Sequence, residues 1–151
     1  MPRRRPAVAV LGLTLALAVA FSTAACNGPT PADLFLVQRS GSVPGAKLTL
    51  RLTDDGGAYC NETKRYELTS AQLITALAIR RDLDGNTDDD VGLAEKHINL
   101  PAGRISTYRY QVRSQNGTVA FADTSAHQPQ TFYRLAELTR EVATQDCHLA
   151  R

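Results

Sequence analysis

The fold class is decided by residues 106–123, STYRYQVRSQNGTVAFAD. Residues 106–113 place Tyr108, Tyr110 and Val112 at alternate positions, as a half-buried β-strand does. The pair Asn116-Gly117 is typical of a two-residue hairpin turn. Apolar side chains alternate again after this turn, within residues 118–123. The stretch therefore predicts an antiparallel β-hairpin.

More extended segments are expected towards the N-terminus. Leucines at alternate positions predict a half-buried strand at residues 48–52, and the turn residues Asp54-Asp55-Gly56-Gly57 follow it. We also expect a strand at residues 34–37, a short return strand at residues 58–60 and a further extended piece at residues 65–68.

Two helices are predicted. Thr69 and Gln72 match a capping box ahead of residues with helical apolar spacing, and this helix should end near Leu83. Pro129 should be the first residue of a last helix, whose apolar face is formed by Phe132, Leu135, Leu138 and Val142. The order of elements predicts an α+β fold, an antiparallel sheet of four to five strands with two helices packed on one face.

The N-terminus has the layout of an export signal. Three arginines at residues 3–5 precede the uncharged apolar residues 7–21, and small residues follow at 22–25. The apolar run is shorter than the ~20 residues that a spanning helix needs. We expect residues 1–25 to be removed as a signal peptide, and residues 33–151 to form a single α+β domain.

The segment Thr23-Ala24-Ala25-Cys26 resembles the lipobox of bacterial lipoproteins. That family prefers Leu where Thr23 stands, so cleavage near Ala24 to give a soluble, secreted product is the alternative. The resemblance implies that Cys26 is the lipidated N-terminus, carrying palmitate-type chains, and that residues 26–32 are a tether. The chain would then be anchored on the extracytoplasmic face of the cell membrane.

Assigning Cys26 to a lipid leaves Cys60 and Cys147, which we predict to form a disulfide in an exported domain. Two buried free thiols are the alternative. Removing the signal also changes the charge, because 17 basic and 15 acidic side chains become 14 and 15. A domain with this slightly acidic balance is not expected to bind nucleic acid.

Metal and catalytic motifs are weak. Asp82, Asp84, Asn86 and Asp88 have the oxygen-ligand spacing of a calcium loop. However, the glycine and the final glutamate of such a loop are replaced by Thr87 and Leu93, so a solvated acidic loop is favoured. The histidines at positions 97, 127 and 148 share no motif, so we expect neither an enzyme nor a cofactor.

The stretch Arg39, Ser40, Gly41 and Ser42 opens a predicted loop that extends to residue 45. Such a loop can present its backbone to a protein partner, although its glycines and proline also suit a simple turn.

Two resemblances cover most of the chain. The lipobox, residues 33–41, Tyr59-Cys60-Asn61, residues 108–123 and Cys147 together resemble actinobacterial lipoproteins of undetermined activity. Residues 34–142 are more faintly similar to emfourin-type inhibitors of thermolysin-like metalloproteases, which share the Arg-Ser-Gly stretch and the order of elements. These resemblances imply a membrane-anchored, non-catalytic domain that binds an extracellular partner, or alternatively a metalloprotease inhibitor.

Overall fold

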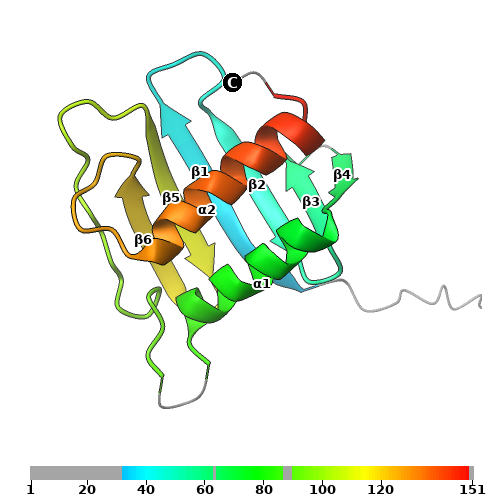
Figure 1. Ribbon diagram of the computed structural model, residues 1–151, viewed down its shortest axis with the longest axis horizontal. Helices are drawn as coiled ribbons and strands as arrows, with labels where there is room; N and C mark the ends of the chain where they lie inside the picture. Colours follow the sequence, from blue (N-terminus) through cyan, green and yellow to red (C-terminus); the bar gives the residue numbers. More distant parts are fainter. Residues whose placement is uncertain (1–31, 63, 87–89, 150–151) are drawn as a thin grey trace, which may run out of the picture.

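Six antiparallel strands form one sheet in the order β4-β3-β2-β1-β5-β6 (Figure 1). The computed structural model describes residues 32–62, 64–86 and 90–149. The strands are β1 (Asp33–Gly41), β2 (Leu48–Thr53), β3 (Gly57–Cys60), β4 (Lys64–Glu67), β5 (Tyr108–Ser114) and β6 (Gly117–Ala122).

Both helices lie on the same face of this sheet, side by side (Figure 1). They are α1 (Ser70–Asp84) and α2 (Gln130–Glu141), and a π-helical turn, η1 (Val142–Asp146), continues α2. No helix among the described residues is long and apolar enough to cross a membrane.

The core lies between the helices and the sheet. Alternation along the central strands puts rows of apolar residues under the helices, and the register aligns Val37 with Leu50 on one side and with Val112 on the other. Three rings, Tyr110, Phe121 and Phe132, stack in series with centroids 5.0 Å and 4.5 Å apart. This stack joins β5 and β6 to α2 in the core.

The predicted α+β class and the two packed helices are confirmed, but the strand count was too low. The piece at Lys64–Glu67 pairs with β3 over its whole length and is a sixth strand. Its residues are charged or half-exposed because it lies at the sheet edge, so they lack the alternation that marks the other strands.

The capping box of α1 is also confirmed. The Thr69 hydroxyl accepts a hydrogen bond from the Gln72 amide, and the Gln72 side chain accepts one from the Thr69 amide. Pro129 is the residue before α2 and not its first residue.

The predicted loop at residues 39–45 was wrong at its start. Strand β1 continues to Gly41, since Arg39 still pairs with Leu48 and Gly41 with Tyr108. A central strand is hydrogen-bonded on both sides, which holds it extended through residues that favour turns in isolation.

Candidate binding surface

The face of the sheet opposite the helices divides into two parts. Over β2, β3 and β4, the charged side chains neutralise one another. Arg51 lies 3.2 Å from Asp33, and Arg65 lies 2.7 Å from Asp55 and 2.9 Å from Glu67. This part therefore has few charged groups left to bind a partner.

Hydrogen bonds also hold two of these acids, Asp55 and Glu67, in their ionised form. The pKa of Asp55 is lowered because its carboxylate accepts hydrogen bonds from the Thr53 hydroxyl and the Arg65 guanidinium. The pKa of Glu67 is lowered by its hydrogen bonds from Arg65. The acids thus remain charged and paired well below neutral pH.

Beyond the start of β1, four polar side chains over β1 and β5 have no side-chain partner among the described residues. Gln38, Ser40, Arg109 and Gln111 alternate with buried residues, so they point away from the helices. None of these four side chains forms a hydrogen bond or ion pair with another described residue. This part of the sheet face therefore offers free donors and acceptors.

A shallow hollow of about 670 Å³ lies over this second part, and we call it the open-face depression. The segment that links α1 to β5 forms one wall, because Leu100 and Ile98 hydrogen-bond to Ala120 along the outer edge of β6. Polar side chains of its lining are Gln38, Ser40, Lys47, Thr49, Asn99, Arg109 and Gln111. Arg39 also belongs to the lining, but its guanidinium bonds to the carbonyl oxygens of Gly45 and Ala46. Lys47 and Arg109 are thus the cations with unpaired side chains among the described residues, and no residue of the lining is acidic. The volume falls within the range of ligand sites.

Of the residues that line the depression, the sequence indicates only Arg39, Ser40 and Gly41 as contact candidates. The alternation of Arg109 and Gln111 with Tyr110 and Val112 does assign them to the non-core face. It does not show that this face stays uncovered, because that depends on where both helices pack.

The four residues of the expected contact loop have different surroundings in the structure. Arg39 is only 5% exposed, and its guanidinium donates to the carbonyl oxygens of Gly45 at 3.2 Å and Ala46 at 2.9 Å. Ser40 and Gly41 line the depression, and Ser42 lies in the exposed turn that follows. The buried guanidinium of Arg39 thus supports this turn from behind.

Gly41 has a structural reason to be glycine. A Cβ atom there would lie 2.1 Å from the Thr107 carbonyl oxygen. Any side chain would therefore push β1 away from the chain that leads into β5.

Three of the calcium candidates, Asp82, Asp84 and Asn86, form hydrogen bonds within the protein. The Asp82 carboxylate accepts hydrogen bonds from Thr131 and Arg134 of α2. The Asp84 carboxylate accepts one from the Asn116 amide at 3.1 Å, and Asn86 hydrogen-bonds to Asp90. Asp88 lies outside the described residues. Within the described ranges, no three His, Cys, Asp or Glu side chains group to hold a metal ion.

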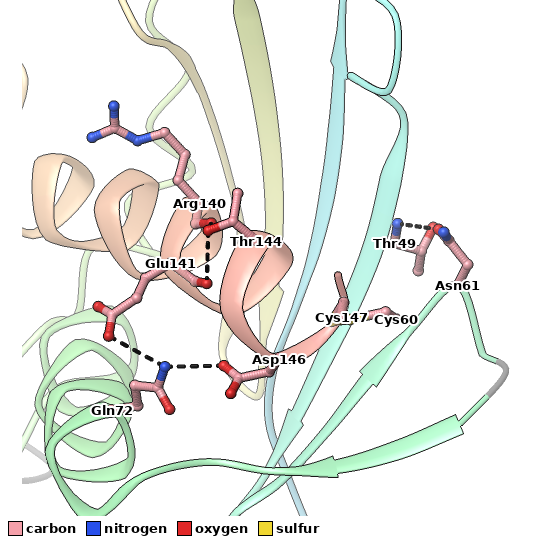
Figure 2. Close-up of a disulfide and its surroundings, with 9 residues drawn as sticks. All are labelled: Thr49, Cys60, Asn61, Gln72, Arg140, Glu141, Thr144, Asp146 and Cys147. Atoms are coloured by element: carbon pink, nitrogen blue, oxygen red, sulfur yellow. Dashed lines mark hydrogen bonds between the residues drawn. A yellow bond between two sulfur atoms is a disulfide. The ribbon is translucent and has the colours of Figure 1, made fainter. Parts of the chain in front are cut away.

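The predicted disulfide is confirmed. Cys60 of β3 and Cys147, directly after η1, are bonded with their Cα atoms 6.2 Å apart (Figure 2). Beside it, the Gln72 amide nitrogen donates to Glu141 at 3.3 Å and to Asp146 at 3.0 Å. The disulfide therefore links the segment after η1 to β3, and the Gln72 hydrogen bonds link η1 and the end of α2 to α1.

The lipid candidate Cys26 lies outside the described residues. Comparison with known proteins adds no relative, since no family model, no curated protein and no solved structure matches this chain.

Proposed function

We propose that this chain is a lipid-anchored, non-catalytic binding domain on the extracytoplasmic face of a bacterial cell membrane. The export-type N-terminus and the lipobox ending at Cys26 support the address. The disulfide between Cys60 and Cys147 agrees with it, because such bonds persist in oxidising compartments.

The observation that carries the binding role is the open-face depression. Lys47 and Arg109 supply positive charge, and the amides of Gln38, Asn99 and Gln111 can pair with a peptide backbone. The aromatic residues of the lining, Tyr110 and Phe121, are buried on the core side of their strands, so a sugar would find no ring to stack on. We infer that the partner is an acidic, extended segment of a protein.

The test uses the full-length lipoprotein and a fluorescein-labelled hexaglutamate peptide, with hexaglutamine as the uncharged comparison. The double substitution Lys47→Glu and Arg109→Glu should weaken hexaglutamate binding at least about tenfold. Binding to the wild type should also fall as salt is raised, because the contacts are exposed charges.

Lys96→Glu is the matched control, because Lys96 is exposed and lies outside the lining of the depression. It should leave the peptide affinity unchanged. Equal affinity for both peptides, or an equal loss in the control and the double variant, would overturn the proposed acidic partner.

The anchor has its own test. Cys26→Ser should release the protein from cells into the medium, whereas the wild type should partition into the detergent phase of Triton X-114. Retention of the variant on membranes would contradict lipidation at Cys26.

A second function, inhibition of a thermolysin-like protease, is favoured by one observation. The exposed turn at residues 42–45 is held from behind by the buried Arg39, and a braced loop loses little entropy on binding. Micromolar lipoprotein should then slow thermolysin, and Ser42→Lys with Pro44→Lys should relieve the inhibition. Normal protease rates with the wild type would exclude this function.

A further inference from the structure

The outward side of α1 is unusually apolar for a helix at the surface. Its exposed positions are Ser70, Ala71, Ile74, Leu77 and Arg81. Ile74 is 68% exposed and Leu77 is 42% exposed. The opposite side of α1 is buried in the core, so both sides of this helix are apolar. A helix that faces water normally carries charged residues on its outer side.

The outward side also has no negative charge. The two acidic residues of α1, Asp82 and Asp84, turn towards other parts of the protein. Asp82 bonds to Arg134 of α2, and Asp84 lies 3.4 Å from Arg80 and bonds to Asn116. Arg81 is exposed, and its side chain bonds to no described residue. An apolar strip that ends in an exposed cation suits an anionic lipid surface.

The chain enters the domain close to this helix. The carbonyl oxygen of Ala32 accepts a hydrogen bond from the Asp54 amide at 3.0 Å. Two residues further on, a Cβ atom at Gly56 would lie 3.6 Å from the Leu73 side chain of α1. Figure 1 shows the start of β1 at the end of the sheet that α1 crosses.

The tether is short enough to keep this side at the membrane. Six Cα–Cα steps separate Cys26 from Ala32, and a fully extended chain covers at most ~3.6 Å per residue. A lipid on Cys26 would therefore hold Ala32 within about 20 Å of the bilayer surface.

We propose that the outward side of α1 lies on the lipid bilayer, with Ile74 and Leu77 entering the interface and Arg81 meeting lipid phosphates. This inference rests on the lipid anchor of the proposed function. In this orientation the start of β1 lies near the membrane. Ser40 is seven residues further along the strand, about 23 Å away, so the open-face depression would face the partner's side.

The experiment exploits the absence of tryptophan from this chain. Ile74→Trp places a single fluorophore on α1, and Ile105→Trp is the matched control, because Ile105 is 85% exposed and lies in the segment before β5. The lipidated full chain is reconstituted into phosphatidylglycerol vesicles that contain brominated lipid. Ile74→Trp should show a blue-shifted emission and at least about a twofold loss of intensity, whereas Ile105→Trp should show neither change.

Leu77→Trp gives an independent probe at the same surface and should be quenched in the same way. Adding Ile74→Glu to it should reduce the quenching, because a carboxylate is repelled from the anionic interface.

The measurements distinguish a failure of the membrane contact from a failure of the lipid anchor. A protein that enters the Triton X-114 detergent phase but shows no quenching at either position refutes the membrane contact and leaves the anchor intact. A blue shift without quenching shows a contact with another protein copy and also overturns the proposal. A protein that stays in the aqueous phase has no lipid, so the anchor and this inference both fail.

Discussion

Arg65 forms ion pairs with two neighbouring acids. It donates to Asp55 at 2.7 Å and to Glu67 at 2.9 Å, and Asp55 also accepts from the Thr53 hydroxyl at 2.6 Å. The folded-state pKa of both carboxylates is lowered from ordinary values of 3.8 and 4.5. A lowered pKa means that the folded state favours the ionised acids, so the pairs stabilise the fold above those ordinary values.

Arg65→Met should therefore lower the stability at pH 7, and this loss should shrink as the pH falls through the lowered pKa values of Asp55 and Glu67. The measurement is the urea midpoint of both proteins between pH 7 and pH 2.5. Arg81→Met is the control, because Arg81 is exposed and its side chain has no described partner. A stability loss that does not change with pH would contradict the assignment.

The side chain of Arg39 has a different role in the structure from the one that its place in the sequence suggests. In the sequence it opens a glycine-rich stretch and resembles an exposed contact residue. In the structure its guanidinium is buried against two carbonyl oxygens and lies 4.9 Å from the centre of the Tyr108 ring. The turn that it braces is exposed, and the arginine itself is not.

At the scale of elements, Gln72 joins the start of α1 to the end of α2. Its oxygen accepts from the Thr69 amide, and its nitrogen donates to Glu141 and Asp146. The side chain is 2% exposed, so losing these bonds leaves groups that water reaches poorly. A capping residue is thus also a contact between helices.

Gln72→Glu should destabilise the protein by about 2–3 kcal/mol at neutral pH, because a third carboxylate would face Glu141 and Asp146 without a proton to donate. The loss should be smaller near pH 4, where the acid is partly protonated. Gln72→Met is the control, since it removes the same hydrogen bonds without adding charge. Guanidinium unfolding measures both, and a Gln72→Glu variant no less stable than Gln72→Met would refute this account.

At the scale of the whole molecule, the disulfide joins segments 87 residues apart. It connects β3 to the chain after η1, and that chain would otherwise be held by α2 and by the Gln72 contacts. A cross-link over a loop of this length restricts the unfolded chain more than the folded one.

The double substitution Cys60→Ala and Cys147→Ala should lower the stability by about 2–5 kcal/mol. Thermal unfolding with and without dithiothreitol checks this expectation. The reductant should lower the melting temperature of the wild type and leave the variant unchanged. An unaltered wild-type melting curve, with the bond shown to be reduced, would contradict a stabilising role.

The proposed contacts place one binding surface near the start of β1 and another near its end. The start of β1 and the outward side of α1 would lie at the membrane, and the depression beside the end of β1 would face a protein partner. Loss of Cys26 would remove the first contact and leave peptide binding intact.

Local patterns in the sequence determined the elements of this protein. Alternation marked β2, β5 and β6, the pair Asn116-Gly117 marked the hairpin, and Thr69 with Gln72 marked the start of α1. These features act over a few residues, so they can be recognised without the fold. The disulfide was also predictable, because few cysteines remained to be paired.

The tertiary structure alone decided which polar residues remain free. The spacing of Asp82 and Asp84 fits either ion ligands or a solvated acidic loop, whereas in the structure Asp82 accepts hydrogen bonds from α2 and Asp84 accepts one from the β5–β6 turn. Arg109 became a candidate contact only because both helices pack on the other face of the sheet and no described acid pairs with it. Whether a charged side chain is paired or free depends on neighbours distant in sequence, and local pattern does not record these neighbours.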